Sequence, residues 1–328
     1  MRLSLVIDGN FLAVKNAFTL NNHKMLYGSL HRAMLANIER VAAMYAWEKI
    51  FFVTDGKPSW RVTVYPEYKA NRVKGDELDW EFVFKTLMAV KKELDDTGRI
   101  ATFNEPMIEG DDWINCICRK NNKVGIGNVV LSGDRDMLQL LAYSSADGWI
   151  NFQIDDTMTR ETTFIPVGYE SVDIGDSKQN TDIFDLSSNG IDFPTFYRNI
   201  TSWNVQHIDP NMSLFVKLVH GDKGDNINSI YESKTKTNKI VNIGEDGAIS
   251  IWHKFNEMNS FRGTRDQSLF ENVVDALSLV KKKQLSDEDL VSIKERLDRN
   301  IRIIELSPRH LPEHIAETIV DRLAPYYQ

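Results

Sequence analysis

The amino-acid sequence predicts an α/β fold, with a mainly parallel central sheet flanked by helices and a smaller helical domain at the C-terminal end. In the first half of the chain, apolar segments of strand length alternate with longer segments of helical periodicity. Such alternation is typical of parallel sheets. After residue 260 the chain has the pattern of amphipathic helices. We therefore expect two domains, over residues 1–208 and 209–328.

The predicted strands of the first half are short and apolar. They are Leu3–Ile7, Ile50–Val53, Arg99–Phe103 and Asn128–Leu131. The segments between them predict the helices Ser29–Trp47, Trp80–Asp95, Gly110–Lys120 and Asp136–Ala142. Residues 160–208 combine β-branched and aromatic residues with Gly, Pro and Asn, which indicates short strands and turns in an insertion without an assigned role.

Helices dominate the rest of the predicted structure. They are Met212–Val219, Gln267–Lys281, Asp287–Asn300 and Pro312–Leu323. Ser286 is the expected N-cap of the third of these, and Pro312 fits the first turn of the fourth. We expect the last three to form the small helical domain.

Length and composition indicate a globular, cytoplasmic protein. The chain has 328 residues, 42% of them hydrophobic and 26% charged, which is enough to bury a full core. No apolar segment approaches the roughly 18 residues that span a bilayer, and the N-terminus predicts a strand rather than a signal peptide. Cys116 and Cys118 lie two apart on a predicted helix and point in different directions, so we expect reduced thiols.

Acidic residues are concentrated in five short clusters, most of which follow an apolar segment. The nine residues are Asp8, Asp55, Glu109, Asp111, Asp112, Asp134, Asp136, Asp222 and Asp225. Because the carboxyl ends of parallel strands lie at one edge of a sheet, folding would bring many of these acids together. Like charges a few ångströms apart need cations between them to stay ionised. The pattern therefore predicts a divalent-metal site.

The ligand chemistry favours Mg²⁺ or Mn²⁺, because every cluster offers oxygen and none offers His or Cys at zinc-binding spacing. Two such cations held by shared carboxylates are the usual means of hydrolysing a phosphodiester. The net charge of −8 speaks against a nucleic-acid partner only weakly, since setting the nine acids aside changes it to +1.

Two alternatives apply to these acids. Any single Asp after a strand could instead form a turn or cap a helix, but five converging clusters are harder to explain in that way. A haloacid-dehalogenase-type phosphatase also carries strand-end carboxylates. It needs a second acid two residues after its nucleophilic Asp, and here that position is Asn10.

The motifs and their order resemble the 5′ nuclease family of flap endonucleases and phage 5′–3′ exonucleases. They are D-G-N, T-D-G followed by R-x-x-x-Y-P-E-Y-K-A-N-R, E-G-D-D, S-G-D-R-D-M-x-Q-L and G-D-K-G-D-N-I, and they extend from Asp8 to about Ile230. The C-terminal segment NIRIIELSPRHLPEHIAETIVDRL is similar to the RNase H of T-even bacteriophages. The resemblance implies a PIN-like nuclease core and a C-terminal domain with a helix-hairpin-helix-like element.

The resemblance also implies roles for residues. The nine acids would bind two Mg²⁺ ions, replaceable by Mn²⁺, directly or through water. Residues 57–80 would form an arch over the active site, in which Lys57, Arg61, Tyr68 and Lys74 contact nucleic acid. Lys69 and Arg72 would be catalytic: three apart on one face of a helix, they could neutralise charge that develops on the phosphate. Trp60 could stack on an unpaired base, but it is expected to be a packing residue, because isolated aromatic residues usually are.

The motif G-D-K-G-D-N-I would open the helix-hairpin-helix element, which in the family binds duplex phosphates and often K⁺. Here the glycine-rich turn of the family is replaced by NSIYESKTKTNKIVNIGEDGAIS, which puts a K⁺ site in doubt. The expected phosphate contacts are Lys223, Lys234, Lys236 and Lys239. A solvated charged loop is the alternative for the last three.

We therefore expect a Mg²⁺-dependent, structure-specific 5′ nuclease with 5′–3′ exonuclease, flap endonuclease and RNase H activity, which removes primers during phage lagging-strand replication. The alternative is a catalytically silent DNA-binding scaffold of the same fold. Expected partners are DNA and RNA–DNA duplexes with 5′ flaps or ends and, from the resemblance, a single-stranded DNA-binding protein on the C-terminal helices. A sliding-clamp contact is left open because neither terminus offers a tail, and we expect a monomer without membrane contact.

Overall fold

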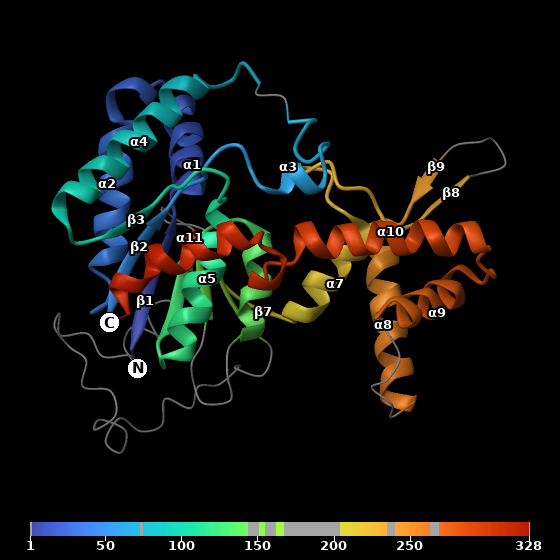
Figure 1. The fold of residues 1–328 in the computed structure, drawn as a ribbon. Helices are drawn as coiled ribbons and strands as arrows, with labels where there is room; N and C mark the ends of the chain where they lie inside the picture. The colour runs from blue at the N-terminus through green and yellow to red at the C-terminus, as the bar shows by residue number, and fades with distance from the viewer. Residues whose placement is uncertain are drawn as a thin grey trace. The chain divides into compact units, whose positions relative to one another are not determined.

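The computed structural model describes residues 2–72, 75–143, 151–154, 162–166, 204–234, 240–262 and 269–327. The chain forms two compact units, drawn as ribbons in Figure 1. The first comprises Met1–Ser59, Lys74–Pro210 and Ser307–Gln328, and the second Trp60–Val73 and Asn211–Leu306. The units are thus discontinuous in sequence, unlike the two continuous domains expected. Residues 60–73 of the arch segment belong to the unit of the C-terminal helices, and the last 22 residues, 307–328, belong to the first unit.

A seven-stranded sheet forms the centre of the first unit. Its strands are β1 (Leu3–Asp8), β2 (Lys49–Val53), β3 (Ala101–Phe103), β4 (Gly127–Leu131), β5 (Asn151–Ile154), β6 (Thr162–Pro166) and β7 (Asn204–Ile208). The strand order is β3-β2-β1-β4-β5-β6-β7, and all neighbours are parallel except β5 and β6. The predicted mainly parallel sheet is confirmed, and β1 is an interior strand between β2 and β4 with every residue buried.

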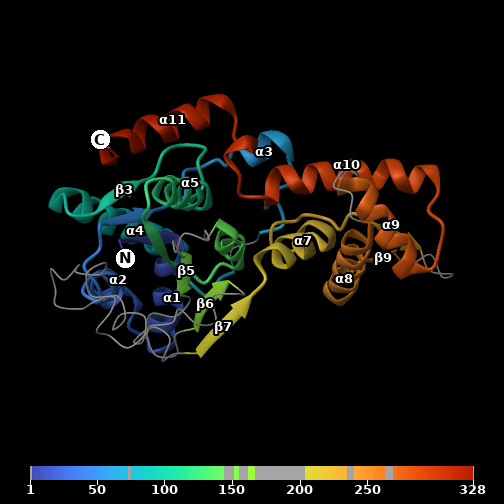
Figure 2. The ribbon, with the colours of Figure 1, turned by 90° about the horizontal axis from the view of Figure 1, so that it is seen from below.

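Helices cover both faces of this sheet. They are α1 (Gly9–Asn22), α2 (Leu26–Ala42), α4 (Trp80–Thr97), α5 (Gly110–Lys123) and α11 (Glu313–Leu323), with 3₁₀ helices η1 (Arg135–Tyr143), η2 (Pro308–His310) and η3 (Ala324–Tyr326). Leu3, Leu5 and Ile7 of β1 share one core with α1, α2 and α4. On the other face, the Phe103 ring stacks on Trp113 of α5 with centroids 4.6 Å apart. Figure 2 shows α1 and α2 on one side of the strands and α5 and α11 on the other.

Several predicted elements differ from those observed in the first unit. Helix α1 was not expected, because its sequence GNFLAVKNAFTLNN lacks a clear apolar stripe; Asp8 caps it by accepting a hydrogen bond from the Phe11 N–H at 3.0 Å. Helix α2 begins at Leu26 and ends at Ala42, earlier than predicted. Residues 136–142 lie in a 3₁₀ rather than an α-helix. Within the insertion 160–208, the described residues form β6 and β7, and the rest lies outside the described residues.

The second unit is mainly helical. It contains α3 (Arg61–Val64), most of α7 (Pro210–His220), the antiparallel pair β8 (Glu232–Lys234) and β9 (Ile240–Asn242), α8 (Glu245–Arg262), α9 (Leu269–Lys281) and α10 (Asp287–Ile304). Its core joins Tyr68 of the arch segment to Phe215 of α7 and to Ile293 and Leu297 of α10. The helix α8 and the strand pair between α7 and α8 were not predicted.

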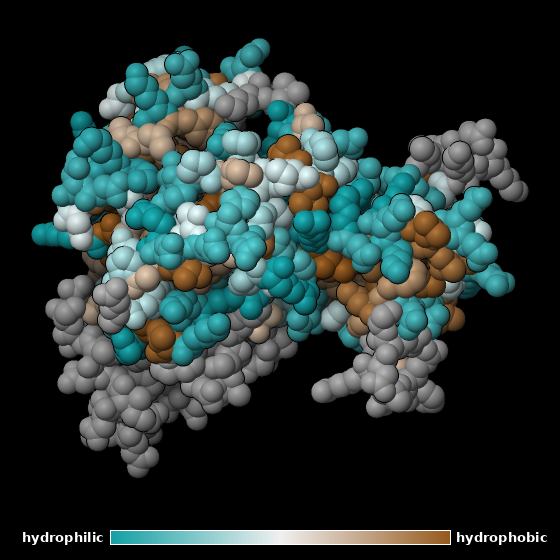
Figure 3. Space-filling view, in the orientation of Figure 1, coloured by the Kyte–Doolittle hydropathy of each residue, from teal (hydrophilic) through white to brown (hydrophobic). Residues whose placement is uncertain are grey.

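Polar residues cover most of the coloured surface in Figure 3, with apolar residues in small groups between them. Among the described residues, the helices are too short or too polar to cross a bilayer. Large apolar side chains are instead gathered in the two cores described above.

Ser286 begins α10, as predicted, in a reciprocal capping box. Its hydroxyl accepts a hydrogen bond from the Asp289 N–H at 3.2 Å, and the Asp289 carboxylate accepts one from the Ser286 N–H at 3.1 Å. Two backbone N–H groups that the helix itself cannot pair are thereby satisfied.

We expect Ser286→Ala to lower the free energy of unfolding of the second unit by about 1 kcal/mol, because the Asp289 N–H loses its side-chain partner. Chemical denaturation followed by circular dichroism measures this loss. Ser292→Ala, in the interior of the same helix, is the matched control and should be neutral or slightly stabilising. Equal effects of the two substitutions would show that the cap contributes nothing.

Candidate active site

The pairing of three neighbouring strands brings acids to one edge of the sheet. In the register of β1 with β2, Asp8 lies opposite Val53, two residues before Asp55. In the register of β1 with β4, Ile7 lies opposite Leu131, and the chain then continues to Asp134. Because the three strands are parallel, their carboxyl ends lie at one edge of the sheet. Asp8 ends β1, and Asp55 and Asp134 follow β2 and β4, so all three acids lie at that edge.

Three carboxylates of the first unit lie at the spacing of metal ligands. One oxygen each of Asp111, Asp134 and Asp136 lies within 4.8 Å of the other two. Asp111 comes from the first turn of α5, whereas Asp134 and Asp136 come from the segment after β4. Oxygen donors of like charge at this spacing fit a hard divalent cation such as Mg²⁺ or Mn²⁺.

Asp8 is buried beside this cluster, with 7% of its surface exposed. Its carboxylate accepts hydrogen bonds from the Ser132 hydroxyl at 2.7 Å and from the Phe11 N–H at 3.0 Å. The pKa of Asp8 is raised to about 7, chiefly by burial and in smaller part by the nearby charges of Asp55 and Asp134, while these two hydrogen bonds act in the opposite direction. A bound cation would favour the ionised form.

Asp55 is held by neutral amide groups. The Asn10 side chain donates to its carboxylate at 2.9 Å and accepts from its backbone N–H at 3.0 Å. The Gly110 N–H, at the start of α5, donates to the other carboxylate oxygen at 2.8 Å. Asn104 donates to the Asp55 backbone carbonyl at 2.8 Å. These contacts join the ends of β2 and β3 to α5.

Glu109 and Asp112 form the capping box of α5, in which each side chain accepts from the other's backbone N–H. Both are buried, with 4% and 3% of their surfaces exposed. These two acids are therefore helix caps, which was the alternative to metal binding. Capping leaves some of their oxygen lone pairs unused, because a carboxylate offers about four acceptor sites.

Three residues that contact the acids were missed by sequence reasoning. Ser132 donates to Asp8 and accepts from the Asp134 N–H at 3.1 Å, Asn10 clamps Asp55, and Gln153 binds the carbonyls of the Ser132–Asp134 segment. Ser132 and Asn10 stand inside the S-G-D and D-G-N motifs, which could have pointed to them. Gln153 carries no such signal.

Lys69 and Arg72 meet at Asp225 in the second unit. The Lys69 ammonium lies 3.9 Å from the Asp225 carboxylate, and the Arg72 guanidinium forms a hydrogen-bonded ion pair with it. The prediction that they share one face of a helix is wrong: residues 66–71 form successive turns, and Lys69 has a φ of +56°. The Lys69 N–H donates to the Asp225 carbonyl at 2.9 Å, which ties the turns to the loop after α7.

Two residues expected to contact nucleic acid are buried instead. Arg61 is 3% exposed; its guanidinium donates to the Ile303 carbonyl at 2.9 Å and stacks on Trp60. Tyr68 is 6% exposed and belongs to the second core. Neither side chain is available to a phosphate or a base in this structure, so these two assignments are corrected. Trp60, 1% exposed, is a packing residue as predicted.

Asp222 closes the loop that follows α7. Gly221, with a φ of +82°, allows the chain to turn there, and a Cβ would meet backbone atoms at 2.4 Å. The Asp222 carboxylate then accepts from the Gly224 and Asp225 N–H groups at 2.7 and 3.2 Å. Burial alone would raise the pKa of Asp222, but the Lys217 ammonium 2.7 Å away and these N–H groups lower it below its ordinary value.

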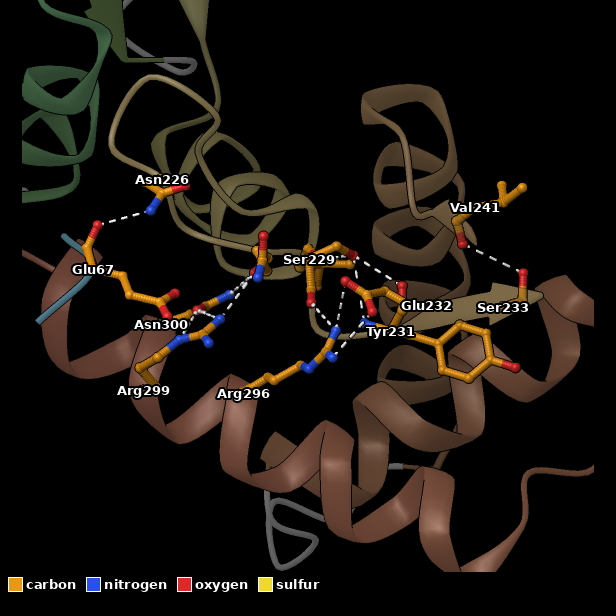
Figure 4. A network of polar contacts seen from close by, with 12 residues as sticks. Glu67, Asn226, Ser229, Tyr231, Glu232, Ser233, Val241, Arg296, Arg299 and Asn300 are labelled. Atoms are coloured by element: carbon orange, nitrogen blue, oxygen red, sulfur yellow. Dashed lines mark hydrogen bonds and ion pairs between the residues drawn. The ribbon is translucent and has the colours of Figure 1, made fainter. Parts of the chain in front are cut away.

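Helix α10 holds the continuation of this loop, as Figure 4 shows. Arg296 donates to the Ser229 carbonyl at 3.2 Å, Arg299 to the Asn228 carbonyl at 3.1 Å, and buried Asn300 to the Leu218 and Asn228 carbonyls. Protein donors therefore bind the Leu218, Asn228 and Ser229 carbonyl groups.

The remaining expected cations are dispersed. Lys57 lies over the Phe84 ring at 4.9 Å in the first unit, and Lys223 is exposed on the loop of the second. Lys74, Lys236 and Lys239 lie outside the described residues, and of Lys234 the structure describes only the backbone. Their nucleic-acid contacts stay predictions.

Residues 3–164 match the family model described as the N-terminal resolvase-like domain of 5′–3′ exonuclease. Residues 3–164 of this chain therefore form a domain of the 5′ nuclease family. The matched residues include Asp8, Asp55, Asp134 and the acids of α5, so the family match covers the acidic edge of the sheet.

Curated relatives share this part of the chain. This chain is 29% identical over 142 residues to the thermostable DNA polymerase I of Thermus thermophilus and 31% identical over 148 residues to the DNA polymerase I of Mycobacterium bovis. It is 27% identical over 143 residues to a 5′–3′ exonuclease of Buchnera aphidicola. Each match covers 42% of this chain, but only 16%, 15% and 48% of the respective relatives.

Solved structures extend the likeness to the whole fold. The bacteriophage T5 D15 protein co-crystallised with metal ions aligns over 100% of both chains with a TM-score of 0.62 and 19% identity. A T5 D15 flap endonuclease in a pseudo-enzyme-product complex with DNA and metal ions aligns equally, at 20% identity. At this identity the likeness establishes the fold.

The raised pKa of Asp8 predicts a pH-dependent stability in the metal-free protein. The folded-state pKa of about 7 exceeds the ordinary 3.8, so the contribution of Asp8 to stability is complete below about pH 4 and is lost as the pH rises through 7. In EDTA, Asp8→Asn should therefore melt at a higher temperature than wild type at pH 8, and the difference should shrink toward pH 4.

Thermal melts of both proteins across this pH range test the prediction. Asp96→Asn, on the exposed face of α4, removes one carboxylate without affecting the site and is the matched control. A difference between wild type and Asp8→Asn that does not change with pH would contradict the raised pKa.

Proposed function

We propose that this protein is a Mg²⁺-dependent, structure-specific 5′ nuclease that acts as a 5′–3′ exonuclease and a flap endonuclease. The observation that carries the proposal is the convergence of Asp111, Asp134 and Asp136 on one point beside buried Asp8. These carboxylates come from separate elements and repel one another, and a bound cation would relieve the repulsion. Hydrolysis of a phosphodiester by two metal ions requires such a set of oxygen ligands.

In the proposed reaction the carboxylates hold and orient the metal ions. Divalent cations bound there would lower the pKa of an attacking water and stabilise the leaving oxygen. Asp111, Asp134 and Asp136 are the proposed direct ligands, and Asp8, Asp55, Glu109 and Asp112 complete the set directly or through water. In-line displacement would leave a 5′-phosphate and a 3′-hydroxyl on the cut strand.

Further roles are proposed for four residues of the second unit from the family resemblance. Lys69 and Arg72 are proposed to neutralise charge that develops on the scissile phosphate. Asp222 and Asp225 are proposed ligands through water. Their carboxylates pair with Lys217 and with Lys69 and Arg72 respectively.

The proposed substrates are DNA and RNA–DNA duplexes with 5′ flaps or ends, and the proposed role is primer removal in phage replication, in the host cytoplasm. The likeness to a T5 flap endonuclease bound to DNA and metal ions supports this substrate class. RNase H activity and a single-stranded DNA-binding partner are proposed from the resemblance to the T-even phage enzymes alone.

Cleavage of a labelled 5′ flap, a nicked duplex and an RNA-primed duplex tests the proposal. We expect cutting with Mg²⁺ and none with EDTA. Asp134→Asn keeps the acceptor for the Asp136 N–H but removes a ligand charge, so its rate should fall by more than the roughly 10–100-fold typical of residues behind a metal ligand.

Binding of the same flap should remain measurable in Asp134→Asn, and Asp96→Asn on α4 should cut at the wild-type rate. If wild-type protein binds these substrates but cuts none of them with Mg²⁺, the nuclease proposal fails in favour of the scaffold of the same fold.

Lys69→Ala and Arg72→Ala should separate chemistry from binding. Each should lower the single-turnover cleavage rate by about 100-fold, because a charge aimed at the transition state is lost, while flap affinity changes far less. Lys254→Ala, which removes an exposed ammonium paired with Glu257 on α8, is the control for loss of positive charge. Equal losses of rate and affinity would make Lys69 and Arg72 ordinary phosphate contacts.

A further inference from the structure

We propose that Gln153 is a positioning residue for the metal centre: its side chain holds the segment that carries Asp134 and Asp136. The inference rests on the proposed metal site and concerns a residue outside the five acidic motifs. Gln153 lies on β5, next to β4, and 1% of its surface is exposed.

Both protons of the Gln153 amide are used on one short stretch of backbone. Its nitrogen donates to the Ser132 carbonyl at 2.8 Å and to the Asp134 carbonyl at 2.7 Å. The orientation of the amide is determined by these partners, because the reversed amide would set its oxygen against two carbonyl oxygens. The side chain thus bridges the two residues that flank Gly133.

The other end of the same amide has no protein partner. The buried Gln153 carbonyl oxygen has no hydrogen-bond donor among the described residues. A buried unpaired acceptor is costly, and an apolar side chain would avoid that cost. The two hydrogen bonds to the Ser132–Asp134 segment are therefore what a glutamine supplies here that an apolar side chain would not.

Strand pairing alone does not hold this segment beyond its first residue. Val130 lies opposite Gln153 and Leu131 opposite Ile154, and the Ser132 N–H donates to the Ile154 carbonyl at 3.1 Å. Past Ser132 the backbone leaves the sheet, and the Asp134 carbonyl is reached by the Gln153 side chain. Gln153 extends the connection to β5 by two residues.

The held segment is linked to three of the acids. Ser132 donates to Asp8 and accepts from the Asp134 N–H, and the Asp134 carboxylate accepts from the Asp136 N–H at 2.8 Å. A shift of the segment would therefore move Asp134 and Asp136 and loosen the contact to Asp8. Residues that orient metal ligands in this way typically change metal affinity by about 10–100-fold when they are replaced.

The test compares metal binding in the full-length wild type, Gln153→Met and Asn151→Leu. Methionine has a similar size but donates no hydrogen bond. Asn151 is the matched control: it lies on the same strand and face, is buried, and donates to the Leu140 carbonyl at 2.8 Å while accepting from Asn128 at 2.9 Å. Mn²⁺ binding is measured by electron paramagnetic resonance, without nucleic acid.

We expect Mn²⁺ affinity about 10–100-fold weaker in Gln153→Met and unchanged in Asn151→Leu. Cleavage by Gln153→Met should recover toward the wild-type rate at high Mn²⁺. Unchanged affinity in Gln153→Met, or an equal loss in Asn151→Leu, overturns the proposal, because the second result would reflect general loosening of β5. Gln153→Leu, which also removes both donors, replaces Gln153→Met if that variant does not fold.

The binding measurement also separates this inference from the proposed function. Wild-type protein that binds Mn²⁺ but cuts no nucleic acid would refute the nuclease and leave the role of Gln153 supported by the affinity difference. Wild-type protein that binds no Mn²⁺ would overturn both.

Discussion

The first unit depends on the parallel pairing of β1 with β2 on one side and β4 on the other. The register places Asp8 opposite Val53, and Ile7 opposite Leu131, so three chain segments leave the sheet at the same edge with an acid each. Burial of β1 on both faces makes a slip of one residue costly, because every side chain would exchange faces. The apolar core therefore holds together charges that repel one another.

The carboxylates of the two units are stabilised by different kinds of groups. In the first unit, the hydrogen bonds described for Asp8 and Asp55 come from a hydroxyl, amides and backbone N–H groups, which stabilise charge without neutralising it. The pKa of Asp8 stays near 7 in spite of them. In the second unit, Asp222 and Asp225 pair with ammonium and guanidinium groups. A bound metal cation would therefore stabilise the ionised carboxylates of the first unit more than those of the second.

The second unit shows how one helix can organise segments far apart in the chain. The Ile303 carbonyl of helix α10 accepts a hydrogen bond from the Arg61 guanidinium. Arg296, Arg299 and Asn300 of the same helix donate hydrogen bonds to carbonyl groups of α7 and of the loop after it. The arch segment and this loop then meet at Asp225. Charged arch residues therefore divide into buried supports, such as Arg61, and groups that remain at the surface, such as Arg72.

The sequence by itself determined the parallel sheet, the acidic edge and the cap of α10, because periodicity, strand-end acids and capping residues are local patterns. It could not separate Arg61 from Arg72, since both are arginines in one basic stretch and only tertiary packing buries the first. It also gave no sign of Gln153, whose partners belong to another strand's loop. Contacts between distant segments depend on strand order and side-chain direction, which are set when the whole chain packs.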